Sequence, residues 1–360
     1  MPSKFKVELA EINWTEFNLK LASRRIPGIF ILLVAAMVSH QIAGGVLGAG
    51  TALSVGFAAS RQLCGSRLLA MVVTASLMAA CAFLGTLAGN CYELALASAA
   101  AGGFMCGLFS LASEDAGWVA MQGVIAFIIG SSFAGFWSHA LERAGCILIG
   151  GLTQSFCILI IWRLENISRF GEEAGLVAGK TGSNSKNWFN IFNEAIKSKV
   201  GVRFGLRVAI TLALAVEIAH LMNLQSDYWL PMTTLIVLKP DFTRTYTGGV
   251  QRVAGTLTGV VLASLMAIIF RPSNDSLIAL VTVSAWGTFL FQKVNPVLFS
   301  AALTFCVVLL IAMTGLPESA VTWHRLTYTF LGCVLALISH FIGFFIIHRS
   351  APSVAKSFKK

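Results

Sequence analysis

The sequence predicts an all-α polytopic membrane protein with about 12 transmembrane helices, arranged as two parallel six-helix repeats joined by a short cytoplasmic linker. Two observations predict this fold class. Apolar residues make up 56% of the 360 residues and charged residues only 12%. Several apolar runs reach the roughly 20 residues that a membrane helix needs, and none alternates with the period of two found in membrane β-strands.

The apolar runs divide the chain into two sets of candidate helices. The first repeat (27–163) is expected to contain helices near 27–43, 46–60, 68–89, 93–113, 116–137 and 144–163. The second repeat (203–347) is expected to contain helices near 203–222, 228–238, 253–270, 276–292, 296–315 and 326–347. The remaining segments are a cytoplasmic or interfacial N-terminal segment (1–26), a cytoplasmic linker with an interfacial helix (164–202) and a basic cytoplasmic tail (348–360). The residues before Arg24 are polar and mixed in charge, so they predict no cleavable signal peptide.

The basic residues predict how the chain lies in the membrane. The formal net charge is +10. With a cytoplasmic N-terminus, every Lys and Arg except Arg143, Arg207, Arg271 and Arg325 falls on the cytoplasmic side. This asymmetry follows the positive-inside rule, so it indicates a multi-pass protein with both termini in the cytoplasm, not a nucleic-acid-binding protein. The eight cysteines are scattered through apolar segments, which predicts free thiols, no disulfide and no metal site.

The two halves resemble each other in order and direction. In each half a long helix ends in a histidine, a weakened second segment follows, and the third helix starts at an arginine. The sixth helix follows an arginine that we expect at the outer helix end, and a glycine stands seven residues later. The paired residues are His40 and His220, Arg67 and Arg252, Arg143 and Arg325, and Gly150 and Gly332. An even number of spans per half makes such repeats parallel.

Pairs of glycines four residues apart recur along the helices. They are Gly44/Gly48, Gly85/Gly89, Gly103/Gly107 and Gly255/Gly259. This spacing lets helix backbones approach closely in lipid, so it predicts helix packing and not a ligand-binding loop.

The segment from Tyr228 to Leu262 is the most informative part of the sequence. Its first apolar run contains Pro231 and stops at Lys239-Pro240-Asp241, after about a dozen residues, which is too short to cross a bilayer as a helix. A long apolar helix is expected to start at Arg252. Short, proline-interrupted segments mark the sites of transporters with broken helices. The glycine-rich segment 44–60 holds the corresponding place in the first half, so we expect a site between the two segments.

Residues of this segment resemble the signature of the fusaric acid resistance family. They are Tyr228-Trp229, Leu238-Lys239-Pro240-Asp241, and Arg252-Val253-Ala254-Gly255-Thr256 with Gly259. The family comprises bacterial inner-membrane proteins that include exporters of aromatic carboxylic acids, and plant organic-anion channels resemble it more distantly. The resemblance therefore implies a bacterial inner-membrane location and a small aromatic or amphipathic organic acid as substrate. The chain lacks the long soluble domain that larger members carry between their halves.

Few charged residues lie inside the predicted helices, and each is a candidate for function because an intramembrane charge is costly. Arg207 lies one turn or more into its helix; it either snorkels to the headgroups or binds a substrate carboxylate. Glu217 and His220 lie three residues apart on one helix face. They are either a polar pair at the outer edge or a proton carrier for proton-coupled transport.

The turn residues and aromatic residues of the short segment also have two interpretations. Pro231, Pro240 and Asp241 are candidates for the turn and for a gate; Asp241 either caps the chain or pairs with Arg252 or Arg244. Tyr228 and Trp229 are either interface-belt aromatics or stack on an aromatic ring of the substrate. We expect Arg207 and Arg252 to neutralise the substrate carboxylate.

The leading hypothesis is secondary active efflux of small organic acids, driven by proton influx through alternating access of the two halves. The alternatives are a passive organic-anion channel and a non-transporting partner in cell-envelope assembly. An enzyme is not expected, because the linker is too short to bury a catalytic core. No cofactor, metal or nucleic acid is expected. The partners we consider are the organic-acid substrate, membrane lipid, and a periplasmic adaptor or further copies of the chain.

Overall fold

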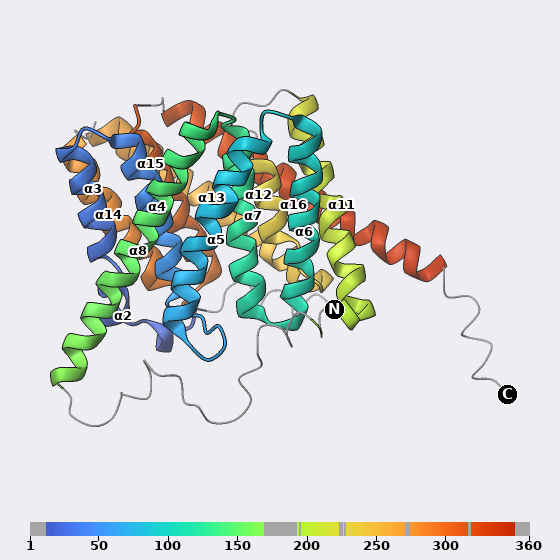
Figure 1. Cartoon of the computed structure of the whole chain (residues 1–360), viewed down its shortest axis with the longest axis horizontal. Coiled ribbons are helices and arrows are strands. Elements are labelled where there is room, and N and C mark those ends of the chain that lie inside the picture. Colours follow the sequence, from blue (N-terminus) through green and yellow to red (C-terminus); the bar gives the residue numbers. More distant parts are fainter. Residues whose placement is uncertain are drawn as a thin grey trace.

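A computed structural model describes residues 12–168, 193, 196–222, 226, 228–270, 274–315 and 318–349. These residues form a bundle of helices and contain no strand beyond one isolated bridge pair between Leu63 and Ser66 (Figure 1). Each of the twelve predicted spans coincides with a helix. The all-α prediction is therefore confirmed for the described residues. The predicted interfacial helix of the linker lies outside them.

The first half begins with a short 3-10 helix η1 (Trp14–Glu16) and helix α2 (Leu19–Ser23). Six longer helices follow: α3 (Pro27–Val38), α4 (Ile42–Ala58), α5 (Arg67–Ala88), α6 (Tyr92–Ala112), α7 (Glu114–Ser132) and α8 (Trp137–Ser168). The second half contains α11 (Lys199–Leu221), α12 (Trp229–Val237), α13 (Phe242–Phe270), α14 (Asn274–Phe291), α15 (Pro296–Ala312) and α16 (Glu318–Arg349).

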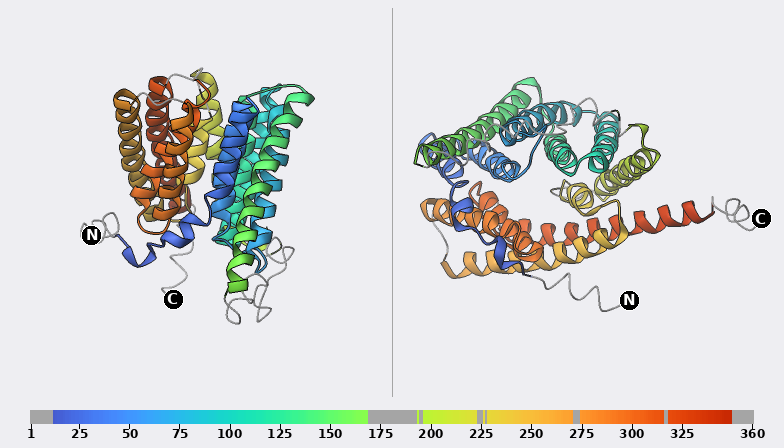
Figure 2. Two further views of the ribbon diagram at one scale, coloured as in Figure 1. Left: turned by 90° about the vertical axis from the view of Figure 1, so that its left-hand side faces the viewer. Right: turned by 90° about the horizontal axis from the view of Figure 1, so that it is seen from below.

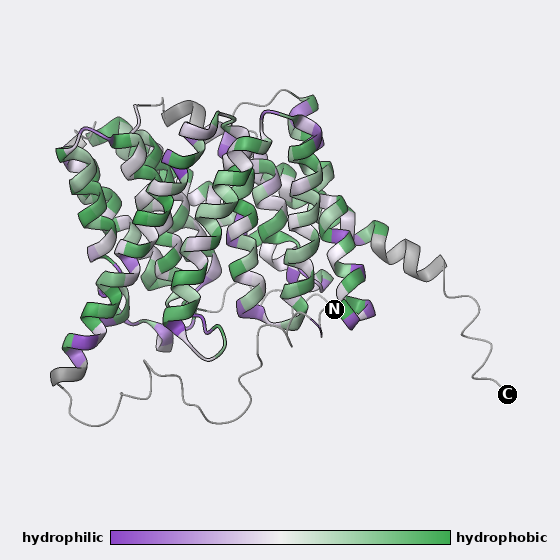
Figure 3. Cartoon of the chain, viewed as in Figure 1, coloured by the Kyte–Doolittle hydropathy of each residue, from purple (hydrophilic) through white to green (hydrophobic). Residues whose placement is uncertain are grey.

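Most helices consist of hydrophobic residues along much of their length, and hydrophilic residues gather towards the helix ends (Figure 3). Among the described residues, seven helices are long and apolar enough to cross a membrane. They are Leu19–Val38, Arg67–Ala88, Tyr92–Ala112, Trp137–Glu165, Lys199–Leu221, Phe242–Phe270 and Trp323–Ile342. Three further apolar helices are shorter, namely Ile42–Ala58, Asp275–Phe291 and Pro296–Ala312. The N-terminal segment, the end of α8 and the start of α11 all lie at the lower end of the bundle in Figure 1.

Equivalent helices of the two halves pack against equivalent neighbours. In the first half α5 packs against α7 and α8, α4 against α8, and α6 against α7. In the second half α13 packs against α15 and α16, α12 against α16, and α14 against α15. The first half forms one layer, and α12 to α16 form the other (Figure 2). Helix α11 lies beside α6 and joins the layers.

The glycine pairs lie at these helix contacts, which confirms their predicted packing role. A Cβ atom on Gly85 or Gly89 would collide with the backbone of α7. One on Gly255 or Gly259 would collide with α15, the equivalent neighbour. The other two pairs also lie against a neighbouring helix: Gly44/Gly48 face α8, and Gly103/Gly107 face α11. Gly150 and Gly332 face the second helix of their own half, α4 and α12 respectively. The glycines therefore set how closely the helix axes approach.

Three helices begin seven or more residues earlier than predicted. Helix α13 begins at Phe242, about three turns before Arg252, because Asp241 caps it and threonines in its polar first turns bond back to the helix backbone. Helices α8 and α16 likewise begin before Arg143 and Arg325. The expectation that these three arginines mark helix starts is wrong, because the polar residues that precede each arginine are also helical. All three arginines consequently lie inside helices.

Helix α12 contains only nine residues, as expected for a segment too short to span a bilayer. Pro231 does not interrupt it; the proline lies in the first turn, where a missing N–H breaks no helical hydrogen bond. The helix ends at Val237, and Leu238 is extended. Almost every α12 side chain is buried, and the helix contacts α16, α11, α7 and α13. A short helix is thus held in the protein interior.

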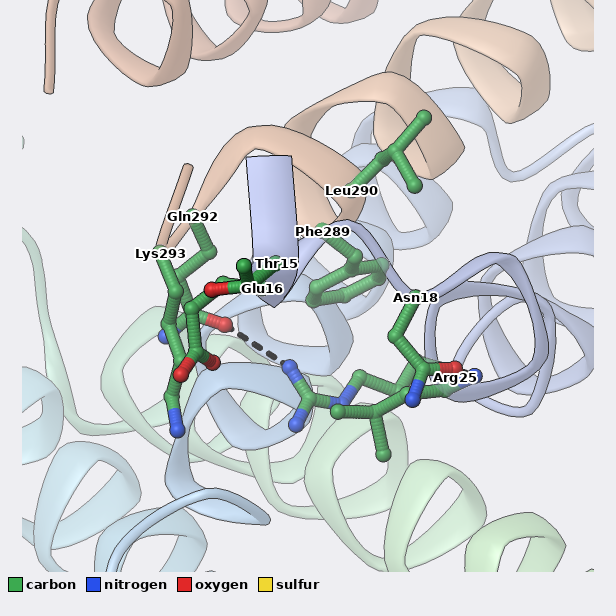
Figure 4. Close-up of a pocket in the computed structure, with 9 residues that line it drawn as sticks. Thr15, Glu16, Asn18, Arg25, Phe289, Leu290, Gln292 and Lys293 are labelled. Atoms are coloured by element: carbon green, nitrogen blue, oxygen red, sulfur yellow. Dashed lines mark hydrogen bonds between the residues drawn. The ribbon is translucent and has the colours of Figure 1, made fainter. Parts of the chain in front are cut away.

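The N-terminal segment packs beneath the second half, where α2 contacts α14 and the Asn13 N–H donates to the Val294 carbonyl (2.9 Å). A small cavity of about 90 Å³ lies at this junction. Figure 4 shows Arg25, which is 3% exposed, donating to Gln292 across it (2.7 Å) beside Phe289. The cavity is lined by Thr15, Glu16, Asn18, Leu21, Arg25, Phe289, Leu290, Gln292 and Lys293. This contact fastens the N-terminal segment to the second half.

Candidate anion site

Arg325 is a buried cation on α16, with 2% of its surface exposed. Its guanidinium carbon lies 4.3 Å from the centre of the Trp229 ring, and its Nη2 approaches the Thr304 hydroxyl at 3.5 Å. Its Nη1 is buried and has no hydrogen-bond partner among the described residues. The expectation that Arg325 lies at the outer end of its helix is therefore wrong, because α16 begins at Glu318 and buries this side chain. A buried guanidinium with an unpartnered nitrogen costs free energy, so Nη1 indicates a place where an anion could bind.

Arg252 on α13 is the second cation of this region, as the sequence analysis proposed. Helices α13 and α16 pack together, and the charges of Arg252 and Arg325 repel each other. The Nε of Arg252 and the hydroxyl of Thr256, one turn further along α13, are also buried without a partner in the described part of the chain. No ion pair among the described residues involves Arg252 or Arg325. The ion pairs that these residues do form use the cations of Lys20, Arg24 and Arg61. The region therefore carries uncompensated positive charge.

Three aromatic rings connect Arg325 to its counterpart Arg143 in the other half. Trp229 and Tyr228 lie 5.0 Å apart between ring centres, and Tyr228 lies 5.8 Å from Phe133 at the end of α7. The guanidinium of Arg143 lies 5.5 Å above the Phe133 ring, and its Nη1 donates to the Phe133 carbonyl (2.7 Å). We call Arg143, Phe133, Tyr228, Trp229 and Arg325 the arginine–aromatic row. It crosses from one half to the other.

The chemistry of this row suits an aromatic anion. Guanidinium groups bind carboxylates through paired hydrogen bonds, and aromatic rings stack against aromatic faces. Tyr228 and Trp229 contact each other, and Arg252 lies close enough to Arg325 for their charges to repel, whereas Arg207 contacts a different part of the chain. Sequence reasoning missed Arg143 and Arg325 as site residues because it placed them at helix ends. The signal that could have identified them is the repeat itself, which pairs these two arginines.

Arg207 instead holds the turn between α12 and α13. Its Nη2 donates to the carbonyls of Lys239 (3.2 Å) and Pro240 (3.1 Å), and its Nη1 contacts Nδ1 of His340 (3.2 Å). Its guanidinium also lies 5.0 Å above the Phe204 ring. We call Arg207, His340 and Thr245, together with the two carbonyls, the loop clamp.

The remaining turn residues are arranged around the same loop. The Asp241 carboxylate accepts a hydrogen bond from the Arg244 backbone N–H (3.2 Å), which is a helix cap. Among the described residues, no ion pair joins Asp241 to Arg244 or Arg252. Lys239 lies near Cys106, Glu114, Arg61 and Arg244. Surrounding protein deprives its ammonium group of hydration, and this lowers the pKa of Lys239.

Glu217 and His220 lie at the opposite end of α11 and share a partner on α6. The Tyr92 hydroxyl donates to the Glu217 carboxylate, and the Tyr92 ring stacks on the His220 imidazole with centres 4.0 Å apart. Glu217 is half-buried and His220 is exposed. The carboxylate, phenol and imidazole thus form one polar group at the α6–α11 contact. Within the described residues, no cluster of histidine, cysteine and acidic residues could hold a metal ion.

Several known proteins are similar to parts of this chain. An "Uncharacterized protein ORF2" from Neisseria gonorrhoeae is 29% identical over 164 residues, which cover 45% of this chain and 38% of that protein. "Inner membrane protein YccS" from Escherichia coli K12 is 23% identical over 41% of this chain and 20% of its own length. "Uncharacterized transporter YdhK" from the same organism is 31% identical over 23% of this chain and 12% of its own length.

These alignments span well under half of the curated relatives' own length. No solved structure matches the chain. The apolar helices and these relatives together identify a multi-pass membrane protein. Residues 214–339, which contain α12, Arg252 and Arg325, match the family model described as "Fusaric acid resistance protein-like". The match confirms that this part of the chain resembles the fusaric acid resistance family.

Proposed function

We propose that the chain is a secondary transporter that exports small organic acids across the bacterial inner membrane. The observation that carries this proposal is Arg325, a buried cation stacked on Trp229 with an unpartnered Nη1. An organic carboxylate would supply the missing acceptor, and an aromatic ring would pack against the rings of Trp229 and Tyr228. The substrate class we infer is therefore an aromatic or amphipathic carboxylic acid.

The proposed mechanism is alternating access between two parallel six-helix repeats. The recurring pairs of packed helices, and the repeated placement of their glycines, support two repeats with the same direction. Because the arginine–aromatic row crosses from one half to the other, a relative movement of the halves would change its geometry. The excess of basic residues at the lower end supports cytoplasmic termini, so this row lies towards the periplasmic side.

Proton influx is the driving force that we propose. Glu217, Tyr92 and His220 form a polar group where a carboxylate and an imidazole can exchange a proton. This group lies near the outer end of α11, where protons would enter. Periplasmic adaptors and further copies of the chain are partners that the proposal allows.

A flux measurement tests this function. The purified full chain is reconstituted into proteoliposomes, and uptake of benzoate-like aromatic acids and of aliphatic acids is measured with and without an imposed pH gradient. The proposal expects accumulation of aromatic acids only when the gradient is present. An organic-anion channel would instead give unitary currents in a planar bilayer without any pH gradient. Absence of flux for every acid would contradict both functions.

A further inference from the structure

His340 is buried at the lower end of α16, with 6% of its surface exposed, and both ring nitrogens are engaged. Its Nε2 lies 2.8 Å from the Lys239 carbonyl oxygen and 3.0 Å from the Thr245 hydroxyl. Its Nδ1 lies 3.2 Å from Nη1 of Arg207. The imidazole therefore connects α11, α16 and the turn between α12 and α13.

These contacts determine the protonation state of the ring. A guanidinium can only donate hydrogen bonds, so Nδ1 must accept and cannot carry a proton. The proton lies on Nε2, which donates to the carbonyl of Lys239. The loop clamp is therefore complete only when His340 is neutral. A second proton on the ring would lie on Nδ1 and point at Arg207, placing two donors and two positive charges against each other.

We propose that His340 is a positioning residue whose protonation opens the loop clamp and frees the turn between α12 and α13. Protonation removes the acceptor that orients Arg207, and repulsion then moves this side chain away from the carbonyls of Lys239 and Pro240. The turn would lose its contacts from α11 and from α16 together. Because α12 carries Trp229 and α13 carries Arg252, movement of the turn reaches both sides of the candidate anion site.

Two charged side chains act on His340, Arg207 from α11 and Asp241 from the turn. Lys239 contacts the ring through its backbone carbonyl, and Arg244 on α13 lies near the Lys239 side chain. The α12 sequence contains no titratable side chain. Asp241 favours a charged imidazole, whereas Arg207 opposes it. The edge of the His340 ring packs against Phe242, with centres 5.8 Å apart, and this apolar contact shields the clamp on one side.

This inference rests on the proposed transport function for its role in the cycle, but its structural content can be measured without transport. The polar group around Glu217 lies at the opposite end of α11, so the two proton-sensitive places are separate. A proton bound at the clamp would release the turn on the cytoplasmic side. The clamp therefore gives α12 and α13 a pH-dependent anchor.

Backbone hydrogen exchange of residues 238–247 tests the proposal, using the full chain in lipid nanodiscs at pH 5.5 and 7.5. His340→Gln is the central variant, because a glutamine amide donates and accepts hydrogen bonds but does not titrate. Comparison at equal pH removes the intrinsic pH dependence of exchange. At pH 5.5 we expect the turn to exchange about tenfold faster in the wild type than in His340→Gln, since one hydrogen bond to a charged group is lost. At pH 7.5 the two should agree.

Two further variants keep the proposal falsifiable if His340→Gln fails to fold. Arg207→Gln removes the charge opposite Nδ1, so the turn should exchange rapidly at both pH values. His340→Lys places a permanent charge in the clamp, so the turn should again exchange rapidly at both pH values. Equal pH responses in the wild type and His340→Gln would overturn the proposal, as would wild-type protection in Arg207→Gln. A pH-dependent turn without any acid flux would contradict the transport function alone; flux with a pH-independent turn would contradict the clamp alone.

Discussion

The guanidinium of Arg325 lies 4.3 Å from the centre of the Trp229 ring, and no acidic side chain among the described residues pairs with it. Cation–π contact with tryptophan contributes about 0.5–2 kcal/mol. Placing an arginine inside a membrane costs about 2.5–3.5 kcal/mol by insertion scales. The aromatic contact therefore does not offset the whole cost, and the anionic ligand that we propose would supply the remaining stabilisation.

Replacing Arg325 with methionine should stabilise the fold and abolish transport. Methionine fills a similar volume without charge, so we expect the free energy of unfolding to rise by about 1–3 kcal/mol. Thermal unfolding in detergent and aromatic-acid flux in proteoliposomes measure the two effects. Arg163→Met, at an exposed position on α8, is the matched control and should change neither quantity. A destabilised Arg325→Met protein would indicate that the arginine has a structural role.

Replacing Trp229 with leucine should reduce the preference for aromatic substrates. One aromatic stacking contact contributes about 0.5–1.5 kcal/mol, so KM for an aromatic acid should rise about twofold to tenfold while KM for an aliphatic acid changes little. Trp229→Phe should retain most of the preference. The control is Trp137→Leu, at an exposed tryptophan on α8. An equal rise in KM for both acids would contradict stacking on the substrate.

Replacing Glu217 with glutamine should separate proton coupling from substrate binding. Glutamine keeps a hydrogen-bond partner for Tyr92 but cannot exchange a proton at neutral pH. We expect proton-driven accumulation to disappear while exchange of internal for external acid continues. Glu142→Gln makes the same chemical change at an exposed position and should retain both activities. Wild-type accumulation by Glu217→Gln would mean that the proton is carried elsewhere.

Replacing Gly107 with alanine should weaken the contact between α6 and α11. A Cβ atom there would lie 2.6 Å from the Cα of Gly205, so the helices must move apart. Overpacking of this kind costs about 1–3 kcal/mol of stability, detectable as a lower melting temperature. Gly145→Ala meets no atom within 4 Å and provides the control, with a gain of up to about 1 kcal/mol from helix propensity. Equal stability of Gly107→Ala and Gly145→Ala would contradict the close approach of α6 and α11.

Lys239 should react with amine reagents at lower pH than a free lysine. The residue as a whole has an exposed surface, but many protein atoms lie around its ammonium group. The hydration that this group loses lowers the pKa of Lys239. The neutral amine, which is the nucleophile, therefore becomes abundant below the usual titration range near pH 10.4. Mass spectrometry of peptide labelling across pH 7–10, with N-acetyl-lysine as reference, measures this shift. The folded state holds this proton less tightly than the unfolded state, so stability should rise with pH between the two pKa values.

The sequence predicts the helices well because apolar runs and glycine spacing depend on local physics. The short α12, the packing role of the glycine pairs and the region that holds Tyr228, Trp229 and Arg252 were all predictable. The helix starts were not, because a polar first turn such as that of α13 resembles a loop until Asp241 is known to cap it. The burial of Arg325 and the clamp at His340 depend on contacts between distant segments, which one sequence does not reveal.

The brevity of α12 has an electrical consequence. Nine residues of helix extend about 14 Å, less than half of the roughly 30 Å hydrocarbon core. If water reaches both ends of this helix, the membrane voltage falls across the shorter distance, and the local field is about twice that of an undisturbed bilayer. A carboxylate crossing beside α12 would then experience most of the voltage within about 14 Å. Export of organic anions, which a negative cell interior assists, would be steeply voltage-dependent at this point.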